Sequence, residues 1–286
     1  MIDVAAAAAR IAPFVHRTPV LRSPALDEWG GAELFVKAEQ RQHTGAFKYR
    51  GATNAVQSLS PQDALRGVAA HSSGNHAAAL ALAARMRDIP AFVVMPKATS
   101  SFKAAAVEQY GARISWCDNT LAARHEILAE VLTATGAVEV HPFNDERVIA
   151  GAGTAAMELV EEIPGLDIIV TPVGGGGLCS GTCCGAPGVR VLGGEPADRS
   201  ATIADGLRTG TSTRTNAILR EHFVERIAVG EDDIVDAMAA VHRTLGEVIE
   251  PSAAVAFAAA RRAGLRGLRA GIICSGGNVD PDALPS

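Results

Sequence analysis

The chain has 286 residues, of which 48% are hydrophobic and 20% are charged. This length allows either one large α/β unit or two domains, and the composition excludes global disorder. A formal net charge of -5 provides no basic field for a phosphate backbone, so we expect no nucleic-acid partner.

The chain begins with the Ala-rich stretch MIDVAAAAARIAPFV, which lacks a basic leader. Arg10 interrupts its apolar residues, so the stretch predicts an amphipathic helix rather than a signal peptide. No uninterrupted apolar run is long enough to span a bilayer. Five cysteines do not make a disulfide framework in a chain of this length, and the group near Cys179 and Cys183 is more typical of small buried side chains than of a metal or redox site. We therefore expect a cytoplasmic protein without a membrane partner.

Strand-like and helix-like segments alternate through the middle of the chain. Short apolar runs predict strands at 67–70, 91–95 and 113–116, and the helical segments after them are 75–86, 102–110 and 122–133. This order is typical of a parallel sheet covered by helices. It predicts a small α/β domain from residue 62 to residue 142.

A second α/β series follows the first. It predicts strands at 167–170, 189–192 and 270–274, and helices at 232–245 and 252–263. We expect residues 1–61 and 143–286 to form a large domain around this series. The fold class is then α/β, with two open, twisted, mostly parallel sheets flanked by helices. In such sheets, ligands bind at the carboxyl ends of the strands.

Four consecutive glycines, Gly174 to Gly177, lie just after the second series' first predicted strand and precede a predicted short helix. Glycines let successive main-chain N–H groups converge on an anion, and a helix N-terminus adds its dipole. The alternative is a flexible loop. Neither the P-loop pattern nor the dinucleotide fingerprint fits the spacing. The segment favours a phosphate cradle.

Lys48 lies between two aromatic residues in the segment TGAFKYRGA. Most lysines are solvated surface charges. A partly desolvated lysine, however, has a lowered pKa and can form an imine with an aldehyde. Taken alone, Asn75 is typical of a helix cap and Ser275 of a turn, so neither indicates a function by itself.

Seven segments in this order resemble the serine/threonine dehydratase and serine racemase family. They are TGAFKYRGA, SSGNH, GGGGL, GEP, IADGL, EPSAA and SGGNVD. That family belongs to the fold type II, tryptophan-synthase-β-like enzymes that depend on pyridoxal 5'-phosphate (PLP). The resemblance runs from about His16 to Asp280, nearly the whole chain. It implies that PLP sits in the cleft between the two domains and that the protein is a homodimer.

The resemblance also implies a role for each matching residue. Lys48 matches the lysine that carries PLP as a Schiff base, and Ser73 matches the serine that serves racemases as an acid or base. The other residues expected to bind the cofactor are Phe47, Asn75, Gly174, Gly175, Gly176, Gly177, Leu178, Glu250 and Ser275. Those expected to bind the substrate are Ser72, Ser73, Gly74, His76 and Arg124. Arg124 would bind a second carboxylate if the substrate were 3-hydroxyaspartate, although the neighbouring acidic position of the family is His125 here.

The sequence departs from the family pattern after Glu195. In racemases and many dehydratases this region holds a divalent metal, and Glu195 matches its first ligand. The segment that follows is short here, and Asp198 is the nearest candidate for a second carboxylate. Mg²⁺ or Ca²⁺ needs several oxygen ligands. The alternative is that Glu195 is a solvated or paired turn residue.

From the resemblance we expect α,β-elimination of a small hydroxy-amino acid, such as serine, threonine or 3-hydroxyaspartate, to a 2-oxo acid and ammonia. A neutral Ser275 at the pyridine nitrogen would make PLP a milder electron sink than a carboxylate would, which favours elimination over transamination. The alternatives are a serine- or aspartate-type racemase, or a β-replacement enzyme, with the same residues. A PLP-binding protein without turnover is a further alternative, against which the intact Lys48 and Ser73 argue.

Overall fold

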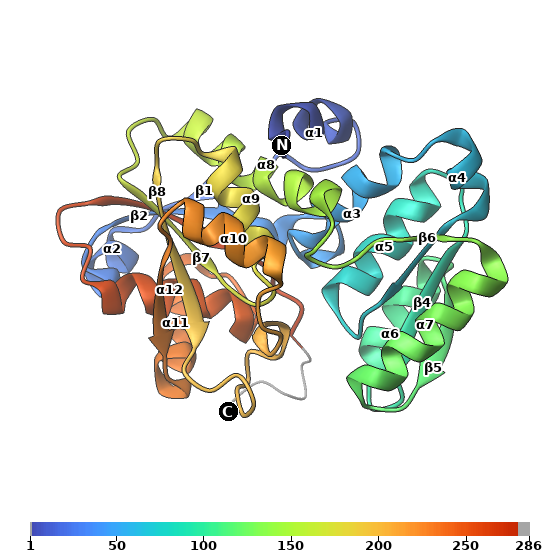
Figure 1. Ribbon diagram of the computed structural model, residues 1–286. Coiled ribbons are helices and arrows are strands. Elements are labelled where there is room, and N and C mark those ends of the chain that lie inside the picture. Colours follow the sequence, from blue (N-terminus) through green and yellow to red (C-terminus); the bar gives the residue numbers. More distant parts are fainter. Residues whose placement is uncertain (1, 280–286) are drawn as a thin grey trace.

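The computed structural model describes residues 2–279, which form two lobes, each built on its own sheet (Figure 1). Asp280, at the end of the last predicted motif, lies outside the described residues. No helix in the described part of the chain is both long and apolar enough to cross a bilayer.

The bounds of the elements are as follows. The strands are β1 (Val20–Leu21), β2 (Glu33–Ala38), β3 (Val68–His71), β4 (Ala91–Pro96), β5 (Arg113–Cys117), β6 (Val138–Glu139), β7 (Ile168–Pro172), β8 (Arg190–Pro196), β9 (Glu225–Val229) and β10 (Arg269–Cys274). The α-helices are α1 (Val4–Ile11), α2 (Pro24–Gly30), α3 (Lys48–Gln57), α4 (Pro61–Arg66), α5 (Asn75–Met86), α6 (Ser101–Gln109), α7 (Leu121–Thr135), α8 (Glu146–Glu162), α9 (Gly177–Gly185), α10 (Thr213–Glu221), α11 (Glu231–Leu245) and α12 (Pro251–Ala263). Three short 3₁₀ turns are η1 (Glu39–Arg41), η2 (His43–Gly45) and η3 (Asp205–Leu207).

The two sheets are almost entirely parallel. The large lobe has the strand order β1-β2-β10-β7-β8-β9, and the small lobe has the order β5-β4-β3-β6. Only the pairing of β1 with β2 is antiparallel among the described strands. This confirms the predicted fold class of two mostly parallel sheets flanked by helices. Parallel pairing also brings the carboxyl ends of β7, β8 and β10 to one edge of the large sheet.

Helices cover both faces of the large sheet. On one face, α2, α11 and α12 pack against the strands, and α8 and α9 cover the other (Figure 1). Every residue of β7 is buried, as expected for a strand covered on both sides. The Ala-rich α12 buries nine consecutive residues, from Ser252 to Ala260, because its small side chains let the helix lie close to the sheet.

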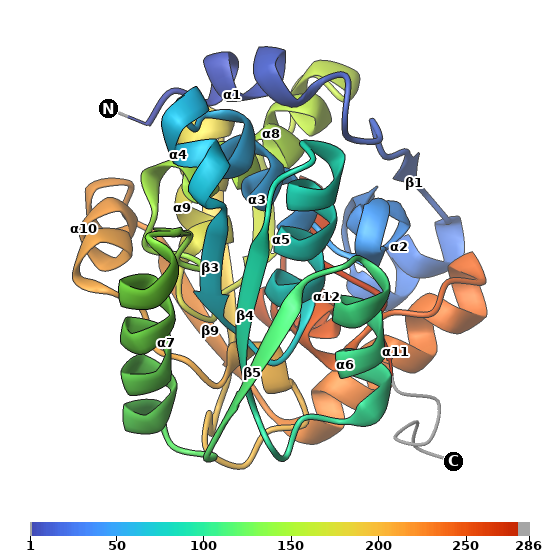
Figure 2. The same cartoon turned by 90° about the vertical axis from the view of Figure 1, so that its right-hand side faces the viewer.

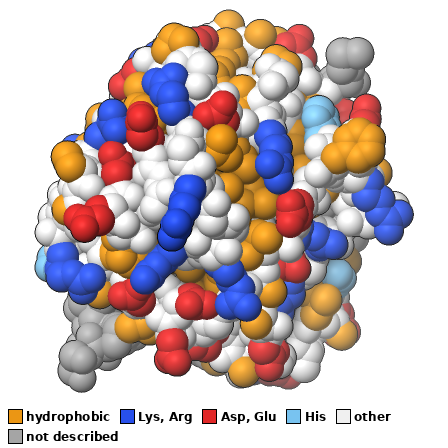
Figure 3. Space-filling view, turned by 90° about the vertical axis from the view of Figure 1, so that its left-hand side faces the viewer, with side chains coloured by type: hydrophobic (Ala, Val, Ile, Leu, Met, Phe, Trp, Pro, Cys, Tyr) orange, Lys and Arg blue, Asp and Glu red, His pale blue; other side chains and the backbone are white. Residues whose placement is uncertain are grey.

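The small lobe has the same layered organisation on a smaller scale. Figure 2 shows α7 on one face of its sheet and α5 and α6 on the other. Residues 140–145 lead from β6 back to α8 and the large lobe. On the opposite side of the large lobe, Lys and Arg side chains lie among Asp and Glu, so no single charge dominates that face (Figure 3).

The predicted elements of both series are confirmed with shifts of one or two residues for most ends. α5 has the predicted bounds, and the strand predicted at 189–192 extends to Pro196 as β8. Several elements were not predicted, β2, α3 and α8 among them. β2 and the residue after it bury the charged side chains of Lys37 and Glu39, and α3 buries Arg50, Thr53 and Asn54. Buried polar residues break the apolar periodicity from which elements are predicted.

Candidate active site

Lys48 begins α3, and its half-buried side chain lies against a main-chain carbonyl and an aromatic ring. Its Nζ donates a hydrogen bond to the carbonyl oxygen of Pro142 at 2.8 Å and lies 5.1 Å from the centroid of the Phe47 ring. Burial lowers the pKa of Lys48 to about 8, and the nearby carboxyl of Glu250 opposes this effect. A substantial fraction of the amine is therefore uncharged and nucleophilic at neutral to mildly alkaline pH.

The loop before Lys48 is fixed by the loop that follows β10. The amide of Phe47 donates to the carbonyl of Ser275 at 3.0 Å, and the amide of Gly277 donates to the carbonyl of Gly45 at 2.9 Å. Gly45 has a φ of 69°, a left-handed conformation that favours glycine. Ser275 itself is 3% exposed, and its hydroxyl makes no hydrogen bond to any described residue. The sheet edge thus places a free hydroxyl beside the lysine loop.

Three polar side chains join the two lobes next to Lys48. Asn75, in the first turn of α5, donates to both carboxyl oxygens of Glu250, at 3.0 and 2.8 Å. Asn278 donates to the side-chain oxygen of Asn75 at 2.9 Å. Burial raises the pKa of Glu250 to about 7, although the hydrogen bond from Asn75 and the charge of Lys48 favour its ionised form. The carboxyl group can therefore change its protonation state near neutral pH.

The four glycines form a tight turn between β7 and α9, which suits the predicted phosphate cradle. A Cβ on Gly175 would collide with the ring of Phe143, and one on Gly177 would lie 2.9 Å from Phe143 Cβ. Gly176 has a φ of 86° and precedes α9 directly. Phe143 is the residue after Pro142, which accepts the hydrogen bond from Lys48. The two-residue segment Pro142–Phe143 therefore contacts the Lys48 amine on one side and the glycine loop on the other.

Three of the predicted substrate residues lie in the turn between β3 and α5, while His76 lies in α5 and Arg124 in α7. Ser72, Ser73 and Gly74 are partly exposed, and the amide of Gly74 donates to Ser72 Oγ at 3.3 Å. A helix's first turn has amides without intrahelical partners, which suits a carboxylate. The His76 side chain points away from such a role, since it is 2% exposed and its Nε2 bonds the Val140 carbonyl at 2.9 Å. Its burial lowers the pKa of His76 to about 3.

A cluster of basic side chains, the basic cluster, lies in the small lobe close to Lys48. It consists of His71, Arg124, His125 and His141. The ring of His71 is 5.0 Å from that of His125 and 6.1 Å from that of His141. Burial, followed by the neighbouring positive groups, lowers the pKa values of His71 and His141 to about 4. Arg124 Nε is buried and has no hydrogen-bond partner among the described residues. The sequence had indicated Arg124 alone, because the histidines converge only in the fold.

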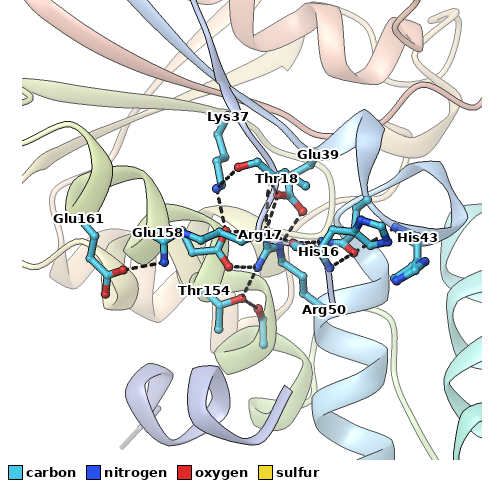
Figure 4. Close-up of polar contacts among 12 residues, drawn as sticks. His16, Arg17, Thr18, Lys37, Glu39, His43, Arg50, Thr154, Glu158 and Glu161 are labelled. Carbon is cyan, nitrogen blue, oxygen red and sulfur yellow. Dashed lines mark hydrogen bonds and ion pairs between the residues drawn. The ribbon is translucent and has the colours of Figure 1, made fainter. Parts of the chain in front are cut away.

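A buried ion-pair network holds α3 in place, and sequence analysis missed it. Arg50, two residues after Lys48, donates to both carboxyl oxygens of Glu39, at 2.7 and 2.9 Å (Figure 4). It also donates to both oxygens of Glu158 on α8, at 2.7 and 2.8 Å. Lys37 completes the network with an ion pair to Glu158 at 2.7 Å. Since all these charges have partners, the network fixes the helix that carries Lys48.

The residues near Glu195 do not fit a divalent cation. The Glu195 carboxylate pairs with Arg199 at 2.7 Å and with Arg226 at 3.6 Å. Asp198 accepts hydrogen bonds from the amide and hydroxyl of Ser200 instead. No group of three or more potential ligands from His, Cys, Asp and Glu occurs within residues 2–279. The expectation of Mg²⁺ or Ca²⁺ bound by Glu195 and Asp198 is therefore not supported. The cysteines among these residues are free thiols.

The residues around Lys48, by contrast, fit PLP. A lysine with a lowered pKa suits an aldehyde, and a glycine loop at a helix N-terminus suits a phosphate. The free hydroxyl of Ser275 suits the ring nitrogen, and Asn75 beside Glu250 suits the polar edge of the ring. Phe47 lies next to Lys48, and Leu178 is buried in the first turn of α9. The chain thus supplies one matching group for each part of the cofactor.

Comparison with known proteins agrees with this geometry. A family model described as "Pyridoxal-phosphate dependent enzyme" matches residues 11–276. The chain is 44% identical to a beta-hydroxyaspartate dehydratase from Paracoccus denitrificans, over 99% of this chain and 97% of the relative. It is 42% identical to a serine racemase from Arabidopsis thaliana, over 96% and 92% of the two chains. The structure of maize serine racemase superposes with a TM-score of 0.93 at 41% identity, covering 98% of this chain and 93% of that one.

Proposed function

Because this chain belongs to the family of pyridoxal-phosphate-dependent enzymes, we propose that it catalyses α,β-elimination of a small 3-hydroxy-amino acid to a 2-oxo acid and ammonia. The observation that carries the proposal is the position of the Lys48 amine, whose pKa is lowered. It donates to the carbonyl of Pro142, the residue before Phe143, whose ring packs on the glycine loop. The relatives named dehydratase and racemase support the same chemistry.

PLP bound at Lys48 supplies an electron sink for the charge that develops at the substrate's Cα. The Lys48 ε-amine would take the proton from the substrate's Cα as a general base. A pKa of about 8 suits this step, since a base works best when its pKa is close to the working pH. The Pro142 carbonyl orients the amine through its hydrogen bond.

The remaining residues bind and orient the substrate and the ring. We infer that the amides at the start of α5, together with Ser72 and Ser73, bind the α-carboxylate. Asn75 and Glu250 hold the two lobes together at the edge of the ring. Ser275 is neutral and would not stabilise a charged ring nitrogen as a carboxylate would, which would favour loss of the β-hydroxyl over transamination.

The basic cluster favours a substrate with a second carboxylate, such as 3-hydroxyaspartate. Arg124 has a buried N–H group that bonds none of the described residues, and three histidines lie close by. A buried polar group without a partner costs stability unless a ligand satisfies it. A carboxylate on the substrate's Cβ would accept that hydrogen bond from the positively charged Arg124 guanidinium, beside the imidazole rings of the cluster. The name of the Paracoccus relative supports this choice.

The test is a substrate panel scored for 2-oxo acid and ammonia, with serine, threonine and the isomers of 3-hydroxyaspartate. Removing Arg124 should lower kcat/KM on 3-hydroxyaspartate by about 100-fold, because a charged hydrogen bond is worth up to about 3 kcal/mol. Activity on serine should change little. Arg113→Ala, an exposed arginine on β5, is the control. An equal loss on serine would remove the argument for a second carboxylate, and absence of any turnover would leave only a PLP-binding protein.

Racemisation is a second candidate, and Ser73 favours it. Its side chain makes no hydrogen bond to any described residue and lies in the partly exposed turn before α5. A proton donor on the face of Cα opposite to Lys48 would return the proton with inverted configuration. Product analysis with L- and D-serine separates the two reactions. A Ser73→Ala variant that loses racemisation and keeps elimination would assign the serine to this step.

A further inference from the structure

The guanidinium of Arg199 donates hydrogen bonds to four oxygen atoms behind the glycine loop. Arg199 lies in the turn after β8 and donates to Glu195 Oε2 at 2.7 Å. Its other hydrogen bonds go to the main-chain carbonyls of Val173 at 3.0 Å, Leu207 at 2.6 Å and Thr209 at 3.0 Å. The oxygens come from three separate segments: the end of β8, the residue after β7, and the chain around η3.

This set of oxygens is of the kind that binds a hard cation. One carboxylate and several main-chain carbonyls are typical ligands of Ca²⁺. Here, however, the positive charge among these oxygens is the guanidinium of Arg199. Asp198, which could have added a second carboxylate, bonds Ser200 instead. A metal ion at this point would have to displace Arg199 and separate it from Glu195.

The segments that Arg199 joins determine the shape of the phosphate cradle. Val173 immediately precedes Gly174, the first of the four glycines. A Cβ on Gly174 would lie 2.9 Å from the carbonyl oxygen of Gly206 and 3.2 Å from Leu207 Cα, so the η3 segment packs directly on the glycine loop. Arg199 bonds residues on both sides of this contact, at Val173 and Leu207. Its guanidinium therefore links the cradle to the segment behind it.

We propose that Arg199 is a built-in cation that takes the place of the divalent metal and holds the phosphate cradle in its binding shape without added metal. Arg199 is a positioning residue, since it acts through Val173 and the glycine loop. Arginine suits this role because its planar group has five N–H donors in a fixed arrangement, whereas lysine has one compact ammonium. The inference rests on cofactor binding by Lys48 and the glycines, and not on the choice of substrate.

The first experiment tests metal independence in the wild-type protein. PLP affinity and melting temperature are measured after treatment with EDTA, and again with millimolar MgCl₂ or CaCl₂ against NaCl of equal ionic strength. We expect all these values to agree within error. A loss of PLP affinity or melting temperature with EDTA that Mg²⁺ or Ca²⁺ restores would overturn the proposal. Neither readout requires turnover, so a wrong substrate assignment would not affect the result.

The second experiment removes the cation. Arg199→Ala should weaken PLP binding by about tenfold and lower the melting temperature by roughly 5 °C, since four charge-assisted hydrogen bonds are lost. Arg226→Ala is the matched control: this arginine faces the same Glu195 carboxylate at 3.6 Å and is 40% exposed, so we expect less than a twofold change in PLP affinity. Arg199→Lys keeps the positive charge, and its PLP affinity is measured instead if Arg199→Ala does not fold. Wild-type PLP affinity in both Arg199 variants would refute the role.

Discussion

Replacing Arg50 with methionine is expected to lower the free energy of unfolding by about 4 kcal/mol, because removing one partner of a buried ion pair leaves an uncompensated charge. Arg50 and Glu39 are both fully buried. Methionine has a similar length, so little volume is lost. Glu39 would keep a hydrogen bond from the Thr18 hydroxyl, and Glu158 would keep its ion pair with Lys37. Most of the cost therefore falls on Glu39.

Thermal and urea unfolding of the wild type and Arg50→Met measure this cost. For a chain of this size, about 4 kcal/mol corresponds to a fall in Tm of roughly 10 °C. The double variant Arg50→Met with Glu39→Gln removes the buried charge as well, so it should recover part of the loss. A change below about 1 kcal/mol in Arg50→Met, or a double variant as unstable as the sum of the two single ones, would refute the reasoning.

Three further predictions concern the site. The rate at which PLP loads onto cofactor-free protein should rise about tenfold per pH unit up to about pH 8 and then level off, because only the uncharged Lys48 amine reacts. A rate that does not change with pH would contradict this. Glu250→Gln should stabilise the cofactor-free protein above pH 7 by up to roughly 3 kcal/mol and have little effect near pH 5. The reason is that the pKa of Glu250 is raised in the folded state, so an ionised Glu250 destabilises the fold above pH 7. Equal Tm changes at both pH values would oppose the assignment. Gly175→Ala should weaken PLP binding by about tenfold because the Phe143 ring must move. Gly210→Ala, whose Cβ meets open space, should leave PLP affinity unchanged. Similar PLP affinities in both variants would exclude a role for the packing of Phe143 on Gly175.

The strand ends and the glycine turns could be predicted from the sequence, because their pattern is local. Short apolar runs followed by Gly- or Ser-rich turns mark β3, β7 and β10, and α5 has the predicted bounds. The local pattern interpreted Ser275, which directly follows β10, only as a turn residue, and its role was indicated by the resemblance alone. Lys48, Asn75 and Glu250 were indicated by the resemblance, and the structure brings them together.

The contacts between distant polar groups could not be predicted. Arg50 and Glu39 are eleven residues apart, and Glu158 is 108 residues from Arg50, so nothing local marks them as partners. Charged residues are almost always exposed, and a single sequence gives no reason to treat these as buried. Glu195 and Arg199 are four residues apart but lie at a strand end, where only the turn brings them together.

The most direct test of the account is whether PLP is attached to Lys48. Purified protein incubated with PLP should show the visible absorbance of a lysine-bound pyridoxal, and borohydride reduction should fix the cofactor on the peptide that contains Lys48. Lys48→Ala should lose both signals, while Lys97→Ala, an exposed lysine paired with Asp118, should retain them. Attachment to a different lysine, or absorbance that survives in Lys48→Ala, would contradict the account.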